Sequence, residues 1–201
     1  MLTPLTRPLP FACVDSSVCA VNINLVACIN GTRLAYKAMK SNGAAGGVII
    51  NISSVLGLQP QGSNPLYAAS KHGLVGFTRS LAHLAREGVR VNTLSPGYAE
   101  TTLVTQGMGD LKMTPETMEV IQGIKDAGGM MAVNQVAEGA MILIEDNTLA
   151  GMVRGTDRRQ SRDGGTRSRP AAAACTYRTV VIAHLTDCSS FCHFRPVFFL
   201  C

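Results

Sequence analysis

The chain has 201 residues, of which 46% are hydrophobic and 15% are charged, and this composition indicates a globular protein and excludes a disordered one. Its net charge of +5 is concentrated in one segment, because the seven arginines and two aspartates from Arg154 to Arg178 already sum to +5. The rest of the chain sums to zero, so its charge gives no reason to expect a nucleic-acid or acidic partner.

The seven cysteines have no regular spacing, and none lies between Ile29 and Ala174. This distribution does not favour a disulfide framework, so we expect a reducing, cytoplasmic compartment. His184, Cys188, Cys192 and His193 match no zinc spacing, and we therefore predict no metal site. Prolines interrupt the first ten residues, which argues against a signal peptide, and we expect no membrane span.

The first predicted helix covers residues 22–40. In residues 1–20 the hydrophobic residues do not recur at regular intervals, so this segment is predicted to be irregular. Over 22–40 apolar residues recur at helical intervals, and Ser41-Asn42-Gly43 marks the end of the helix. Asn24 lies near the start of this helix, where an asparagine can simply act as a cap.

A strand, a long helix and a second strand follow. Residues 48–53 form an apolar, β-favouring run, residues 66–86 have helical periodicity with Gly88 as the stop, and residues 89–94 form another strand pattern. A strand–helix–strand succession predicts a parallel βαβ unit, whose ligands bind at the carboxyl ends of the strands. Polar residues at those ends are therefore the candidates for chemistry.

Three such residues have a spacing with a chemical use. Tyr67 and Lys71 are four positions apart in the predicted helix and so share one face, while Ser54 follows the first strand. A nearby ammonium favours the phenolate and lowers a tyrosine pKa that is otherwise about 10. A serine hydroxyl can hold a substrate oxygen against that phenol. A lone Tyr-x-x-x-Lys is more often a solvated lysine beside a packed ring, and the preceding serine is what favours catalysis here.

The remaining segments are less regular. A helix is predicted over residues 134–144 and a last strand over 150–156. After Thr156 the composition changes abruptly to an arginine-rich stretch and then a stretch rich in cysteine and phenylalanine. Residues 157–201 are predicted to be an unfolded tail or a mis-framed sequence. A basic segment that binds RNA or an acidic membrane is the alternative.

The segments INISSVLG, YAASKHGLVGFTRSLA and GVRVNTLSPGYAET together resemble the short-chain dehydrogenase/reductase family, and in particular its NAD-dependent hydroxyprostaglandin dehydrogenase branch. The resemblance covers residues 21–156. It implies an α/β fold, the C-terminal part of a Rossmann-like, doubly wound parallel sheet. It also implies an oxidoreductase that converts a small secondary alcohol to a ketone.

The resemblance assigns a role to each catalytic candidate. By this likeness Ser54 positions the substrate oxygen, Tyr67 exchanges its proton, and Lys71 lowers the tyrosine pKa and holds the nicotinamide ribose. Asn24 corresponds to a helix asparagine that supports a proton-relay water, which favours function over capping.

Further positions match the cofactor and substrate regions of the family. Pro96, Gly97 and Thr101 match the segment that closes on the nicotinamide, and residues 101–129 match a variable substrate lid. Asn64, in the loop 59–64, stands where the prostaglandin branch favours glutamine. The implied cofactor is NAD, with NADP as the alternative. Met108, Met113 and Met118 could line an apolar pocket, although gap-filling in the core is the preferred interpretation.

The first half of such a domain has no counterpart in the sequence. No strand is followed by the glycine-rich turn that would hold a pyrophosphate, and Gly43, Gly46 and Gly47 precede a strand. We therefore expect a truncated sheet with residues 48–53 on an exposed edge, and weak or no cofactor binding by these 201 residues alone. The alternative function is an inactive homologue that acts through dimerisation. In either case the resemblance implies a homodimer formed through helices 22–40 and 66–86.

Overall fold

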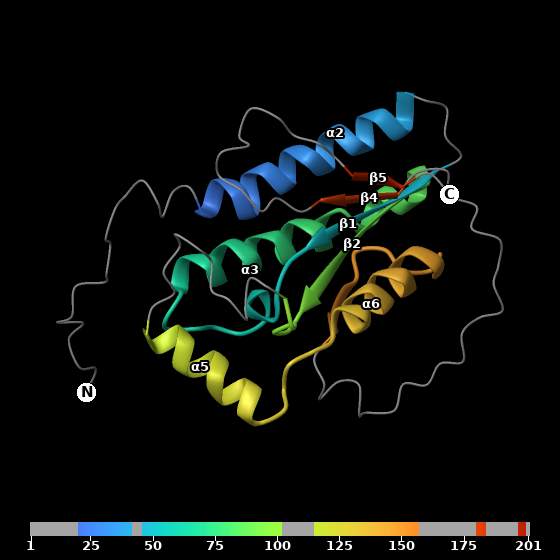
Figure 1. Cartoon of the computed structure of the whole chain (residues 1–201). Coiled ribbons are helices and arrows are strands. Elements are labelled where there is room, and N and C mark those ends of the chain that lie inside the picture. The colour runs from blue at the N-terminus through green and yellow to red at the C-terminus, as the bar shows by residue number, and fades with distance from the viewer. Residues whose placement is uncertain (1–19, 42–45, 102–114, 157–179, 184–196, 200–201) are drawn as a thin grey trace, which may run out of the picture.

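The computed structural model describes residues 20–41, 46–101, 115–156, 180–183 and 197–199. In these residues five strands form one sheet with the order β3-β2-β1-β4-β5 (Figure 1). The strands are Gly47–Ile52 (β1), Val89–Pro96 (β2), Val153–Thr156 (β3), Val180–Ala183 (β4) and Val197–Phe199 (β5). The first four in the order are parallel and β5 is antiparallel to β4, which confirms the α/β class.

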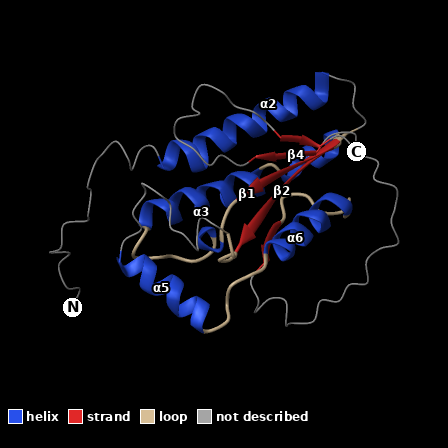
Figure 2. Ribbon diagram, viewed as in Figure 1, coloured by secondary structure: helices blue, strands red, loops and turns tan. Residues whose placement is uncertain are grey.

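Helices cover both faces of the sheet. A π-helical turn, Asn22–Val26 (η1), runs directly into Ala27–Ser41 (α2), and α2 lies with Pro65–Ser80 (α3) on one face (Figure 2). Val133–Glu145 (α6) covers the other face, and Pro115–Asp126 (α5) lies beyond the end of the sheet. This is the doubly wound arrangement that the sequence predicts.

The alternation of side chains along β1 produces two cores. Ile49 packs with Val89 and Val91 of β2 beneath α2. Val48 and Ile50 point to the opposite face. There they pack with residues of β2 and α6, which are Leu94, Leu143 and Ile144. Because both faces are covered, β1 is apolar almost throughout, as expected of a buried parallel strand.

The predicted βαβ unit is present, with one difference in the helix. β1 and β2 pair in parallel, and α3 connects them. However, α3 ends at Ser80 and not at residue 86, because Leu81 leaves the helical conformation and Ala82–Glu87 forms a 3-10 turn (η3). Gly88 then stops that turn in the left-handed conformation with φ 81°, where glycine is favoured, as the sequence predicts.

The expectation that the first strand lies on an exposed edge is wrong. β1 pairs on its second edge with β4, in parallel, so its backbone groups have partners on both sides. β4 and β5 both come from the segment 157–201, and the rest of that segment lies outside the described residues, as do residues 1–19. No local pattern predicts β4 at this position, because its parallel partner β1 lies far away along the chain.

The predicted lid region contains one regular element. Helix α5 lies within residues 101–129, while residues 102–114, with Met108 and Met113, are outside the described part. Met118 is on α5 and is 46% exposed, so it does not fill a gap in the core. The helix predicted over 134–144 is confirmed as α6, and the last strand is confirmed as β3.

A buried arginine fastens α6 to the sheet. Arg90, in β2, donates hydrogen bonds to the carbonyl oxygens of Leu143 (2.9 Å), Ile144 (2.7 Å) and Leu149 (2.9 Å). These carbonyls lie in the last turn of α6 and the loop after it, where backbone acceptors have no partners within the helix. Arg90 therefore fixes the end of α6 against β2. Among the described helices, none is long and apolar enough to cross a membrane.

Candidate active site

Ser54 lies just beyond the carboxyl end of β1. The backbone N–H of Ser53 still donates to the Leu94 carbonyl at 2.8 Å, so the strand pairing reaches almost to this residue. Ser54 is extended, with φ −159° and ψ 161°, and its Oγ accepts a hydrogen bond from the Leu56 N–H at 3.2 Å as the cap of the 3-10 turn Val55–Gly57 (η2). The sheet and this turn together fix the position of its hydroxyl.

Tyr67 lies in the first turn of α3. Asn64 caps this helix, because its Oδ1 accepts from the Tyr67 N–H at 3.4 Å, and Pro65 is the first helical residue. Proline suits that position, since its ring sets a helical φ and it has no N–H to leave unbonded. Asn64 thus has a structural task at the start of the helix that carries Tyr67. Its assignment to substrate binding stays a prediction.

The structure brings the Ser54 hydroxyl close enough to Tyr67 to influence the pKa of its phenol. Burial is the largest influence on the tyrosine and raises the pKa of its phenol above the ordinary value of 10.0. Ser54 acts in the opposite direction and lowers the pKa, and the neighbouring Tyr98 raises it further. The phenol is therefore protonated at neutral pH in this form of the protein.

Lys71 lies one turn after Tyr67 on the same face of α3. Only 3% of the residue is exposed, its Nζ donates to the Ile52 carbonyl oxygen at 3.0 Å, and it lies 5.5 Å from the centre of the Tyr67 ring. Burial lowers the pKa of Lys71, while Cys28 acts in the opposite direction. The net shift of the Tyr67 pKa is upward, so the lowering expected from Lys71 does not prevail in this form of the protein.

Asn24 lies on the neighbouring helix, within the π-helical turn η1. It is therefore inside a helix and does not act as its cap, and its half-buried side chain has no hydrogen bond with Ser54, Tyr67 or Lys71 in the described residues. The turn packs against α3 where Gly73 leaves room for Leu25, since a Cβ at Gly73 would lie 2.9 Å from Leu25 Cδ2. Widened turns of this kind are frequent at functional sites. The proton-relay role of Asn24 stays a prediction.

Sequence reasoning missed Cys28, which lies four residues after Asn24. It is 3% exposed, its thiol donates to the Ile23 carbonyl oxygen at 3.9 Å, and it interacts electrostatically with Lys71. Burial raises the pKa of Cys28, and Lys71 opposes this rise. The four-residue spacing from Asn24 was the available signal, because such residues share a helix face.

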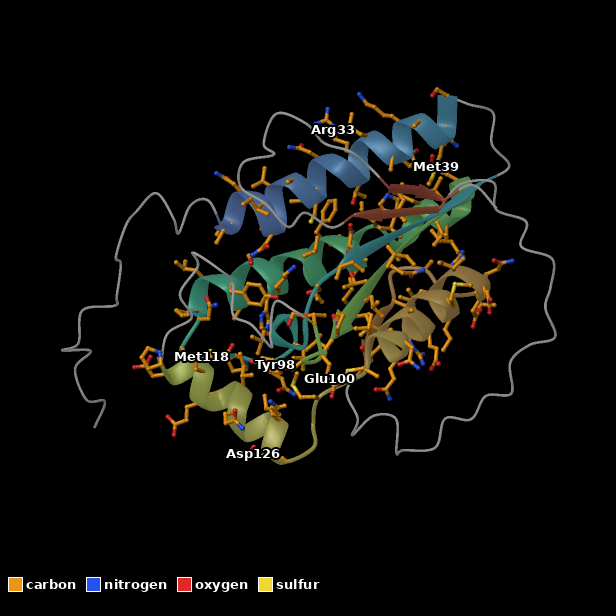
Figure 3. All side chains as sticks on the ribbon, viewed as in Figure 1. Arg33, Met39, Tyr98, Glu100, Met118 and Asp126 are labelled. Atoms are coloured by element: carbon orange, nitrogen blue, oxygen red, sulfur yellow. The ribbon has the colours of Figure 1, made fainter. Side chains whose placement is uncertain are left out.

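Tyr98 and Gln61 were also missed. Gln61 Nε2 donates to the Tyr98 hydroxyl at 3.3 Å, and both side chains are half-buried. Tyr98 directly follows Pro96-Gly97 at the carboxyl end of β2, and Figure 3 shows it at that end of the sheet, between α3 and α5. No local pattern could have paired two residues 37 positions apart.

The predicted cofactor segment is at the same end of the sheet. Pro96 is the last residue of β2, and Gly97 and Thr101 follow it in the half-buried chain. The Thr101 N–H donates to the Ala99 carbonyl at 2.8 Å, which folds this segment back on itself. The described residues include no group of three or more potential metal ligands, and the histidines and cysteines at 184–193 lie outside them.

Comparison with known sequences gives one consistent assignment. A family model described as short chain dehydrogenase matches residues 12–110. The 15-hydroxyprostaglandin dehydrogenase (NAD+) of Rattus norvegicus is 40% identical over 139 residues, which are 66% of this chain and 52% of that protein. The protein of that name from Homo sapiens is 41% identical over 140 residues, again 52% of its length. The chain thus spans about half the length of these relatives.

Solved structures agree in fold. The structure described as ElxO with NADP bound has a TM-score of 0.60 and 23% identity, and the match covers 74% of this chain and 59% of that one. At this identity it supports the fold alone. A 4-hydroxyisoleucine dehydrogenase complexed with NADH has a TM-score of 0.55 and 27% identity, with 68% of this chain and 56% of that one covered.

Proposed function

Because the chain belongs to the short-chain dehydrogenase/reductase family, we propose that the protein is an NAD-dependent oxidoreductase that oxidises a secondary alcohol to a ketone. One observation carries this proposal. A serine, a tyrosine and a buried lysine meet at the carboxyl end of parallel strands, with Ser54 close enough to lower the pKa of the Tyr67 phenol and Lys71 Nζ 5.5 Å from the centre of the tyrosine ring. This is the edge at which open α/β sheets bind ligands.

The relatives guide the choice of substrate and cofactor. The 40% identity to a 15-hydroxyprostaglandin dehydrogenase that uses NAD+ supports a hydroxy fatty acid or a prostaglandin-like alcohol as substrate and NAD as cofactor. NADP is the alternative, because the residue that chooses between the two follows a strand with no counterpart in these 201 residues.

In the proposed reaction the substrate loses one proton and one hydride. The phenolate of Tyr67 accepts the hydroxyl proton, and Ser54 holds the same oxygen by a hydrogen bond as it changes from alcohol to ketone. When bound, the nicotinamide supplies the acceptor for the hydride. The Lys71 ammonium favours the phenolate, and Asn24 supports the return of the proton to solvent.

The described residues fit the nicotinamide end of this cofactor. The Lys71 ammonium has three donors and gives one to Ile52, which leaves donors for ribose hydroxyls. Pro96-Gly97 at the end of β2 and Thr101 would lie beside the ring. A glycine-rich turn for the pyrophosphate is not present in the 201 residues, so these residues account for one end of the cofactor.

The test is NADH formation by the full protein supplied with NAD+ and a panel of secondary alcohols, hydroxy fatty acids included. Tyr67→Phe removes the proton acceptor and should lower turnover by about 10²–10⁴-fold. Tyr36→Phe is the matched control, because the Tyr36 hydroxyl donates to Glu87 on the surface and is remote from Ser54. Equal turnover by Tyr67→Phe and Tyr36→Phe would refute the proposal.

A second candidate is an inactive homologue that acts through dimerisation. The exposed apolar side chains of Val26 and Leu34 on η1 and α2 support it, because they offer a surface to a partner copy. On this reading NADH does not bind saturably to the purified 201-residue chain. Saturable binding would exclude this candidate.

We also propose that two copies associate through α2 and α3. Val26 and Leu34 on η1 and α2 are 40% and 55% exposed, which gives this face apolar side chains for a partner copy. Sedimentation should show a dimer that Leu34→Glu weakens, and a monomer at all concentrations would contradict it. The cysteine distribution supports a cytoplasmic location for this assembly.

A further inference from the structure

Two polar side chains that bond to each other, one of them close to Tyr67, have no assigned part in the proposed proton transfer. Gln61 comes from the loop between η2 and α3, and Tyr98 from the segment after β2. Their side chains meet in a hydrogen bond of 3.3 Å from Gln61 Nε2 to the Tyr98 hydroxyl oxygen. Tyr98 is also close enough to Tyr67 to affect its charge state.

The backbone holds Tyr98 in a fixed position. Its carbonyl oxygen accepts from the Met131 N–H at 2.8 Å, and the Glu100 N–H donates to the Met131 carbonyl at 2.8 Å. Ala99 and Met131 thereby form a parallel bridge that ties this segment to the start of α6. A ring anchored on a bridged segment is positioned before a ligand arrives, which lowers the entropic cost of binding.

The direction of the Gln61–Tyr98 bond determines what the pair offers a ligand. The tyrosine oxygen accepts from the amide, so its own proton is available for donation, and the Gln61 carboxamide oxygen is available as an acceptor. One donor and one acceptor match a neutral oxygen group such as a hydroxyl. Neither side chain carries a positive charge that would select a carboxylate.

We infer that Gln61 and Tyr98 form a polar subsite that selects alcohols with a second hydroxyl or carbonyl oxygen within a few bonds of the reacting carbinol. The inference rests on the proposed dehydrogenase function and adds a substrate class to it. The bonded pair faces the same end of the sheet as Ser54 and Tyr67. A substrate whose first oxygen lies against Tyr67 can therefore place a second oxygen against Tyr98.

The test compares kcat/KM of the full protein for a secondary alkanol and for a diol or hydroxyketone of the same chain length. The wild type should prefer the dioxygenated substrate. Tyr98→Phe keeps the ring but removes the hydroxyl, and should reduce kcat/KM for that substrate about tenfold more than for the alkanol, mainly through KM. Gln61→Met keeps the side-chain length and should have a similar effect.

Tyr36→Phe is again the control, and the melting temperature of each variant reports on folding. If the wild type oxidises both alcohols equally well, or if Tyr98→Phe lowers both rates alike, the subsite is refuted while the dehydrogenase function stands. If neither alcohol is oxidised, both proposals are overturned.

Discussion

Among the described residues two cations are buried, one on each face of the sheet, and their surroundings differ. Arg90 and Lys71 are each 3% exposed. Arg90 donates to at least three carbonyl oxygens at the end of α6 and in the loop after it. Lys71 donates to one carbonyl oxygen among the described residues and lies over the ring of Tyr67.

The difference in hydrogen bonding distinguishes Arg90, a cation with a structural role, from Lys71, a cation with donors available to a ligand. A buried charge is costly unless hydrogen bonds compensate it, and Arg90 has compensation from the backbone it fastens. Lys71 is less well compensated, and burial lowers its pKa accordingly. Ionisable groups with a shifted pKa are frequent at functional sites, because binding and catalysis depend on them there.

The largest effect should come from replacing the lysine. Lys71→Met keeps the length of the side chain and removes its charge, so we expect alcohol oxidation to fall by about 10²–10³-fold. The melting temperature should stay the same or rise, because the cost of burying an ammonium disappears. Turnover and thermal unfolding on the same preparation would check both. Full activity in this variant would contradict the role given to Lys71.

Replacing Arg90 should lower stability and leave activity nearly unchanged, which is the reverse of the effect expected for Lys71→Met. Arg90→Met leaves the carbonyls of Leu143, Ile144 and Leu149 without their donor, and we expect unfolding to become easier by about 3 kcal/mol. Turnover per folded molecule should change little. Urea unfolding measures the loss, with the exposed Arg86→Met as the control. Similar stability for the two variants would show that Arg90 does not hold α6.

The pH dependence of kcat should be set by Tyr67 and not by Arg90. Burial raises the pKa of Tyr67 above 10.0, and alcohol oxidation needs the phenolate, so kcat should rise with pH across the neutral and alkaline range. Below that pKa the rise should approach tenfold per pH unit. Arg90→Met should keep this profile when the rate is expressed per folded molecule. A rate that is flat from neutral to alkaline pH would indicate that Tyr67 is not the base.

The smallest effect should come from Cys28. Its presence raises the pKa of Lys71, so Cys28→Val should let the lysine lose its proton at a lower pH. We expect a change in turnover of only a few-fold, seen mainly on the alkaline side of the profile. Cys28→Ser cannot form a thiolate and should therefore change the profile as Cys28→Val does. If both variants keep the wild-type profile, Cys28 only fills space.

The part of the site that the sequence predicts is the part built from local spacing. Tyr67 and Lys71 share a face because they lie four residues apart in a helix, and Ser54 follows the strand that precedes them. The parallel pairing of β1 and β2 follows from the helix that connects them.

The missed features depend on contacts between distant segments. The end of α3 at Ser80 has no glycine or proline to mark it, and the residues that follow, Leu81 and Leu84, pack against the core formed with β2. The bond between Gln61 and Tyr98 joins two loops, and β4 pairs with β1 across more than a hundred residues. Neither leaves a local pattern in the sequence.

The most direct test of the contrast between the two cations is the melting temperature of the full-length protein with and without NADH. A ligand that binds only the folded state raises this temperature. We predict a rise for the wild type and for Arg90→Lys, and no rise for Lys71→Met. A rise of equal size in Lys71→Met, or none in the wild type, would contradict the conclusion that Lys71 is the cation kept for a cofactor.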